Sequence, residues 1–181
     1  PGFDPTPFAA DPVTPALLDL PETYLLHVGT LHPRKGLVFL LKALAALRDH
    51  PTQPTLVCAG RAGWMTASIL RQVEELRLEK RVRFLDFVPH EQLTALYHQA
   101  RMLVLPSLYE GFGFTPLESM AASTPVICSR AGSLPEVVGD AALIVPVGDV
   151  AALVTAIRRL LDETDLRRQL VANGLQRCRQ F

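Results

Sequence analysis

The feature of this sequence that most constrains its fold is the alternation of short apolar runs with longer segments of helical periodicity. Six runs are almost wholly apolar: 24–28 (YLLHV), 55–59 (TLVCA), 82–87 (VRFLDF), 102–105 (MLVL), 125–128 (PVIC) and 142–145 (ALIV). Strands that are covered on both faces of a parallel sheet have this continuous apolar character. The six runs are therefore predicted to be buried strands.

Between these runs, apolar residues recur at the i, i+3, i+4 and i+7 positions of one helix face. The clearest such segments are 37–47, 93–100, 150–160 and 166–178. Strand and helix in regular alternation predict an α/β fold, a doubly wound, Rossmann-like parallel six-stranded sheet with helices on both faces. Residues 1–21 hold six of the 15 prolines and show no periodicity, so we interpret them as a hinge or linker before a domain at 22–181.

Composition excludes several classes of protein. The 181 residues carry 18 basic and 18 acidic side chains, so no charge excess favours nucleic acid as a partner. No apolar run approaches the ~18 residues of a membrane-spanning helix. The cysteines, Cys58, Cys128 and Cys178, lie far apart, which predicts reduced thiols packed in the core and a cytoplasmic location.

Two loops carry the residues best suited to chemistry. In a doubly wound sheet, ligands bind beyond the carboxyl ends of the strands where the strand order reverses, which in the common six-strand order is beside strands 1 and 4. The loop after the first strand holds Gly29, Thr30, Arg34 and Lys35 directly before a helical segment. Cations are poorly placed at a helix N-terminus unless an anion binds there, so this loop predicts a phosphate site.

The loop after the fourth strand reads EGFGFTPLE, residues 110–118. Its two glycines allow backbone amides to approach a ligand closely in front of a helix N-terminus. Thr115 and Glu118 have the spacing of a capping box around Pro116, which accounts for one carboxylate but not for Glu110. Carboxylates only accept hydrogen bonds, so the pair also suits the hydroxyl groups of a sugar and a ribose.

The segment EGFGFTPLE resembles the Glu-x7-Glu motif of retaining, nucleotide-sugar-dependent glycosyltransferases of family 4 (group 1), which have the GT-B fold. VGTLHPRKG resembles the phosphate loop of that family, and TPVICSRAGSLPEVVGDAALIVPVGDVAAL resembles the segments that follow its motif. The opening PGFDPTPF resembles the hinge between its two domains. The resemblance extends over essentially the whole chain and implies the C-terminal, donor-binding half of a GT-B enzyme.

The resemblance also implies roles for individual residues. Arg34 and Lys35 would neutralise the departing diphosphate, Glu110 would contact the transferred sugar, and Glu118 would bind the ribose. The remaining donor-binding residues would be Gly29, Thr30, Gly111, Phe112, Gly113, Phe114 and Thr115, with Gly60, Arg61 and Val88 bordering the nucleobase. Many relatives carry arginine where this chain has Thr30, which leaves the division of labour at the diphosphate open.

The resemblance implies transfer of a hexose from a nucleotide diphosphate sugar with retention of configuration, and without a metal because Arg34 and Lys35 would neutralise the diphosphate. The sequence is consistent with this, since no aspartates stand two residues apart and no cluster has metal-ligand spacing. GDP-mannose and UDP-hexoses are both compatible donors. The acceptor, a glycan, lipid or small molecule, would bind to an N-terminal domain that is absent from this chain, and the full-length enzyme could contact a membrane surface. The chain alone is expected to bind donor weakly and transfer little.

Other classes remain as alternatives. A dinucleotide-dependent oxidoreductase is disfavoured because Pro116 stands where Gly-x-Gly-x-x-Gly needs its third glycine, and a P-loop NTPase because no Gly-Lys-Ser/Thr follows Gly29. A non-catalytic nucleotide-sugar-binding module, or another GT-B enzyme such as an epimerase or phosphorylase, stays open. Among smaller features, His32 is a candidate phosphate donor, Trp64 a helix anchor and Glu136 a helix-start carboxylate.

Overall fold

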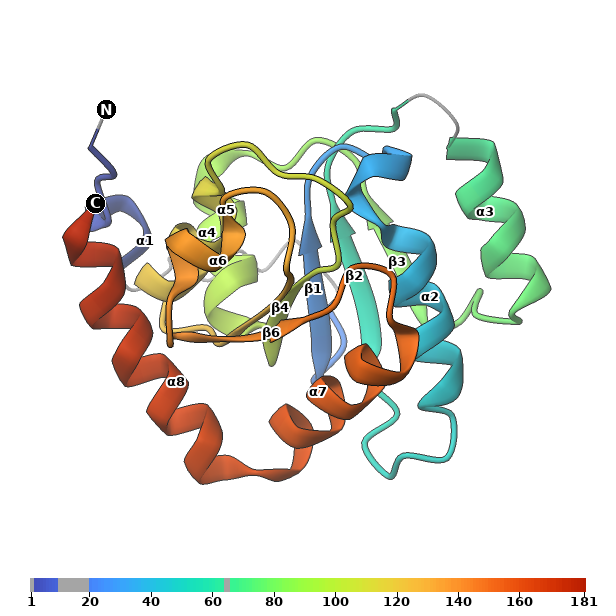
Figure 1. Ribbon diagram of the computed structural model, residues 1–181. Helices are drawn as coiled ribbons and strands as arrows, with labels where there is room; N and C mark the ends of the chain where they lie inside the picture. The colour runs from blue at the N-terminus through green and yellow to red at the C-terminus, as the bar shows by residue number, and fades with distance from the viewer. Residues whose placement is uncertain (1, 10–19, 64–65) are drawn as a thin grey trace.

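A computed structural model describes residues 2–9, 20–63 and 66–181 of the chain. Its centre is a parallel sheet of six strands in the order β3-β2-β1-β4-β5-β6 (Figure 1). The strands are β1 (Tyr24–Val28), β2 (Thr55–Ala59), β3 (Val82–Leu85), β4 (Met102–Leu105), β5 (Val126–Ser129) and β6 (Ala142–Val145). The predicted doubly wound sheet is confirmed, and the order reverses between β1 and β4.

Helices cover both faces of the sheet, as predicted. One face packs against α2 (Leu37–Ala46), α3 (Thr66–Glu75) and α7 (Val150–Asp162), and the other packs against α1 (Thr6–Ala9), α4 (His90–Gln99), α5 (Phe114–Ala121) and α6 (Leu134–Val138). The chain ends with α8 (Thr164–Arg177) and a 3-10 turn, η2 (Cys178–Gln180). Because Leu170 of α8 belongs to the first core and Cys178 of η2 to the second, the segment formed by α8 and η2 crosses from one face to the other (Figure 1).

The strands are apolar throughout because neighbouring residues bury into different cores. Leu25 packs on the α2 face and Leu26 on the α4 face, and neither side chain is exposed. The burial of a Leu or Val side chain contributes about 1.5–3 kcal/mol, so two covered faces hold the sheet together. This two-sided burial is what the continuous apolar runs of the sequence indicate.

Two strand boundaries differ from the prediction. The strand predicted over 82–87 ends at Leu85, because its neighbour β2 ends at Ala59, which pairs with Leu85. The chain turns away at Gly60, whose amide lies 3.2 Å from both the Leu85 and Asp86 carbonyl oxygens. The strand predicted over 125–128 runs one residue later, as Val126–Ser129.

The N-terminal residues, which the sequence predicts to be a hinge, linker or extended entry segment, contain the short helix α1. Phe8 is buried there, and its ring makes edge contacts with His90 at 4.8 Å and Tyr97 at 6.0 Å between centroids. The Phe3 amide donates to the Phe181 carbonyl at 2.8 Å, which ties this segment to the end of α8 and η2. The hinge role of residues 1–21 stays a prediction.

The three cysteines are buried and unpaired, as the spacing predicted. None of the helices in the described part of the chain combines the length and apolar character needed to cross a membrane.

Candidate functional site

The loop after β1 carries Arg34 and Lys35 on its own short 3-10 turn, η1 (Pro33–Lys35), and not on the first turn of α2. His32 begins this turn, because its ring nitrogen Nδ1 accepts a hydrogen bond from the Arg34 amide at 3.1 Å. Gly36 ends it in a left-handed conformation with φ of 67°. The turn therefore holds both cations ahead of the helix, and His32 acts within it as a cap.

The loops after β1 and β4 touch each other through their backbones. The Leu108 amide donates to the Arg34 carbonyl at 2.8 Å. A Cβ atom on Gly36 would lie only 1.9 Å from the Pro106 carbonyl oxygen, so a side chain has no room at this position. The two loops that the topology predicted to be neighbours are thus packed directly together.

This contact brings Arg34, Lys35 and Glu110 into one cluster. Lys35 Nζ lies 2.6 Å from Glu110 Oε1, and Arg34 lies 3.4 Å from Glu110 Oε2. Arg34 also donates to the Tyr109 carbonyl at 2.8 Å, and the Ser107 hydroxyl donates to Glu110 Oε1 at 2.7 Å. Two cations face one carboxylate, so the cluster keeps a net positive charge.

The electrostatics of Glu110 follow from these contacts. Glu110 is only 9% exposed, and this burial raises the pKa of its carboxyl group. Hydrogen bonds from Lys35 and Ser107, with the charges of Lys35 and Arg34, outweigh burial and leave the pKa of Glu110 below its ordinary value. The group is therefore an ionised acceptor at neutral pH.

The glycine loop after Glu110 is held by the loop that follows β5. The Ser133 hydroxyl donates to the Gly111 carbonyl and, at 2.9 Å, to the Phe112 carbonyl. A Cβ atom on Gly132 would lie 2.1 Å from the Glu110 carbonyl oxygen, so the two loops are in close contact. Sequence analysis did not find Ser107, Gly132 or Ser133, because an isolated serine or glycine gives no signal of its partner.

The capping box predicted for Thr115 and Glu118 is wrong. Helix α5 begins at Phe114, its N-cap is Gly113 with φ of 87°, and no side chain caps it. The left-handed glycine starts the helix earlier than the box requires, so Thr115 lies inside the first turn. The rings of Phe112 and Phe114 pack at 4.7 Å between centroids, and both are partly exposed at the loop.

Glu118 is bound to α4 instead. The Tyr97 hydroxyl donates to its carboxylate at 2.7 Å. Burial raises the pKa of Glu118, and this effect exceeds the opposing effects of the Tyr97 hydrogen bond and the nearby His90. Tyr97 is a further site residue that the sequence did not reveal, because its helical spacing indicated only a core position.

The remaining predicted residues line a hollow of about 280 Å³ beside the ends of β1, β2 and β3. It is lined by Gly29, Thr30, Gly60, Arg61 and Val88, which were predicted, and by Val28, Ala59, Phe87 and Leu93, which were not. The Leu31 amide donates to the Arg61 carbonyl at 3.0 Å, which joins the loops after β1 and β2. A Cβ atom on Gly60 would lie 2.2 Å from the Gly29 carbonyl oxygen, so these loops also meet backbone to backbone.

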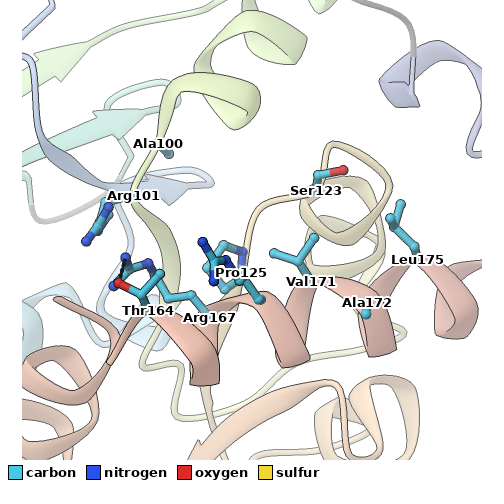
Figure 2. A pocket seen from close by; sticks show the side chains of 10 residues that line it. Ala100, Arg101, Ser123, Pro125, Thr164, Arg167, Val171, Ala172 and Leu175 are labelled. Atoms are coloured by element: carbon cyan, nitrogen blue, oxygen red, sulfur yellow. Dashed lines mark hydrogen bonds between the residues drawn. The ribbon is translucent and has the colours of Figure 1, made fainter. Parts of the chain in front are cut away.

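A second hollow, of about 440 Å³, lies between α8 and the amino ends of β4 and β5, at the opposite end of the sheet (Figure 2). Arg101 and Arg167 line it, and they donate to the Leu161 carbonyl at 3.0 Å and the Leu160 carbonyl at 2.8 Å. Their charges thus stabilise the C-terminal end of α7. This hollow is separate from the candidate site.

Two smaller predictions have different outcomes. Glu136 lies in the first turn of α6, as predicted. Trp64 lies outside the described residues. No group of three metal-ligating side chains is found within residues 2–9, 20–63 and 66–181.

His27 is a buried polar residue beneath the cluster. Its Nδ1 lies 3.0 Å from the Val104 carbonyl oxygen, so Nδ1 carries the proton and donates it, while Nε2 is buried without a partner among the described residues. Burial, with a contribution from Lys35, lowers the pKa of His27 to about 4, although the Val104 hydrogen bond and Glu110 oppose the shift. His27 is therefore neutral at physiological pH.

We expect the protein to lose stability as the pH falls from about 6.5 to about 4 because of His27. In this range the unfolded chain binds a proton that the folded chain excludes, so stability rises with pH across the window and falls when acid is added. The contribution is ~3 kcal/mol over the whole window. Urea unfolding of the wild type and His27→Asn at a series of pH values measures it, and identical pH profiles would contradict it.

The fold and the site together present a doubly wound sheet with a cationic pair, two carboxylates and a hollow at its carboxyl edge. The family model for glycosyl transferases group 1 matches residues 15–177. The chain belongs to this family.

Known relatives agree with the assignment. The chain is 40% identical over 161 residues to O-antigen chain mannosyltransferase B of Escherichia coli, covering 88% of this chain and 42% of that protein. Sucrose-phosphate synthase from Thermosynechococcus elongatus superimposes with a TM-score of 0.86 at 34% identity, over 99% of this chain and 46% of that chain. Anabaena HepE in complex with UDP-glucose has the same fold, with a TM-score of 0.85 at 24% identity, over 99% of this chain and 51% of that one. The chain thus spans about half the length, or less, of each of these three proteins.

Proposed function

We propose that this chain is the donor-binding domain of an enzyme that transfers a hexose from a nucleoside diphosphate sugar to an acceptor with retention of configuration. The observation that carries the proposal is the cluster of Arg34 and Lys35 against Glu110, at the point where the strand order reverses. Donor-binding residues would be this cluster, the glycine loop, Glu118 and the hollow beside β1. The mannosyltransferase name of the E. coli relative supports a hexose as the transferred group.

The proposed chemistry depends on charge placement. Breakage of the bond between sugar and phosphate puts negative charge on the leaving diphosphate, and Arg34 and Lys35 would stabilise that charge. One preorganised donor of this kind contributes ~3–4 kcal/mol to transition-state stabilisation in comparable sites. Since these cations neutralise the leaving group, the proposed mechanism uses no metal.

The two carboxylates would have separate tasks. Glu110, ionised and fixed by Lys35 and Ser107, would accept hydrogen bonds from the hydroxyls of the transferred sugar. Glu118, oriented by Tyr97, would accept hydrogen bonds from the ribose. The diphosphate would then lie between the carboxylates, over the amides of the glycine loop, with the base in the hollow beside Val88.

The acceptor would be bound by a further domain, which residues 1–21 would connect to residues 22–181. The acceptor would be a glycan, a lipid or a small molecule, and the enzyme would act in the cytoplasm. The buried free thiols are compatible with a reducing compartment.

Titration of the chain with UDP-glucose, GDP-mannose and the corresponding nucleoside diphosphates, followed by NMR or calorimetry, tests the proposal. We expect binding in the millimolar to high micromolar range, and little sugar transfer by this chain alone. Glu118→Ala should weaken the binding of these nucleotides, because the carboxylate that would bind their ribose is lost. Glu91→Ala, which removes an exposed carboxylate on α4, is the control and should leave binding unchanged. Absence of binding by every nucleotide sugar at millimolar concentration would refute donor binding and favour a scaffold. Rapid transfer by the chain alone would refute the need for a second domain.

A further inference from the structure

One side of the hollow beside β1 is formed by a cation and an aromatic ring. The guanidinium carbon of Arg61 lies 5.0 Å from the centre of the Phe87 ring. Phe87 is 65% exposed, which is unusual for a side chain of its size, and Arg61 is exposed as well. Their stacking keeps a planar guanidinium group at the mouth of the hollow.

The hydrogen-bond donors of the Arg61 side chain are not used by the described residues. It forms neither a side-chain hydrogen bond nor an ion pair with the described residues, so its N–H groups are free to meet a ligand. Its backbone, in contrast, is fixed, because its carbonyl accepts from Leu31 at 3.0 Å and the flanking Gly60 is packed on Gly29. A Cβ atom on Gly63 would lie 2.6 Å from the Leu31 carbonyl oxygen, so the following turn is packed as closely.

The rest of the hollow suits the faces of a flat ring. Val28, Val88 and Leu93 contribute apolar side chains, and among the described residues that line it Arg61 is the one that carries a charge. A bound base would therefore bury its faces against apolar groups and meet one strong donor group at an edge. The identity of the base then depends on which edge Arg61 can satisfy.

We propose that Arg61, held by Phe87, selects guanine, so that the donor is a guanosine diphosphate sugar. This inference rests on the proposed function of the site. Guanine presents two adjacent acceptors, O6 and N7, which match the two parallel N–H groups of a guanidinium. Adenine presents one acceptor and one donor at the same edge, and uracil lacks N7. Of these three bases, only guanine can therefore form such a bidentate pair with Arg61.

The test is the affinity of the chain for GDP, ADP and UDP, measured by NMR titration. GDP should bind about tenfold or more tightly than ADP or UDP, because a bidentate pair discriminates by ~5- to 150-fold. Arg61→Met should remove most of this preference and leave binding of UDP nearly unchanged. Arg61→Lys should also lose most of it, because lysine has no planar fork. Arg71→Met, at an exposed position on α3, is the matched control and should keep it.

The outcomes separate the inference from the proposed function. Equal binding of the three nucleotides, or a preference for UDP or ADP, would overturn guanine selection and leave nucleotide binding standing. An equal loss of all three in Arg61→Met would mean that Arg61 contacts the ribose or the phosphates, which also overturns the inference. Failure of every nucleoside diphosphate to bind would refute both.

Discussion

Replacement of Lys35 by methionine is expected to abolish the preference of the chain for nucleoside diphosphates over monophosphates. Lys35 Nζ is held 2.6 Å from Glu110 at the reversal of the sheet, where it would meet the second phosphate. A hydrogen bond to a charged group contributes ~1.5–3 kcal/mol, so the ratio of affinities should fall by about 10- to 150-fold. Affinities for UDP against UMP and GDP against GMP, measured by NMR titration, give this ratio without assuming a base.

Lys42→Met is the matched control. Lys42 lies on the exposed side of α2, the helix that follows Lys35 in the sequence. Its replacement removes the same charge without changing a residue of the cluster. The control should keep the preference for diphosphates. If Lys35→Met kept it too, Lys35 would not contact the diphosphate, and its bond to Glu110 would be purely structural.

A second consequence of the same change concerns Glu110. Without Lys35, the carboxylate keeps Ser107 and Arg34 as partners but loses the hydrogen bond that most opposes burial. The pKa of Glu110 should therefore rise in the variant, which NMR of the labelled carboxyl carbon can follow. This readout reports on the cluster directly and does not depend on any ligand.

Much of the site was predictable because the sheet topology determines which loops are neighbours. The apolar runs identify the strands, and the order of a doubly wound sheet places the loops after β1 and β4 side by side. Those two loops also contain charged residues that helix capping does not explain, Arg34, Lys35 and Glu110. The position of the loops and the charges in them were together enough to predict the cluster, although not its distances.

The parts that could not be predicted depend on contacts between distant segments. Ser133 fixes the Phe112 carbonyl from another loop, and Tyr97 fixes Glu118 from another helix. Nothing local distinguishes such a serine or tyrosine from others in the chain. The capping box failed for a related reason: Thr115 had the right spacing, but the left-handed Gly113 had already started the helix.

The loops of the site support one another through backbone contacts at glycines. Gly36 packs on Pro106, Gly60 on Gly29, and Gly132 on Glu110, so the loops after β1, β2, β4 and β5 form one connected layer. Such contacts preorganise charges before a ligand binds, which lowers the reorganisation that binding and catalysis require. Because the backbones meet at these glycines, a single added methyl group at one of them would push two loops apart.

Gly36→Ala should therefore be the most destabilising of the single substitutions considered. Its Cβ would lie 1.9 Å from the Pro106 carbonyl oxygen, and its φ of 67° is unfavourable for any residue with a side chain. Left-handed strain alone costs about 1–2 kcal/mol, and separating two packed loops adds the loss of buried contacts, so we expect a total loss of ~3 kcal/mol or more in the free energy of unfolding.

Gly111→Ala is the matched control for stability, because a Cβ atom there meets nothing within 4 Å. It should change the free energy of unfolding by less than ~0.5 kcal/mol. Urea denaturation of both variants and the wild type measures the difference. If Gly36→Ala unfolded at the same urea concentration as Gly111→Ala, the loops after β1 and β4 would be able to separate at little cost. The cationic pair would then not be held against Glu110 by the fold, and the preorganisation on which the proposed mechanism depends would be lost.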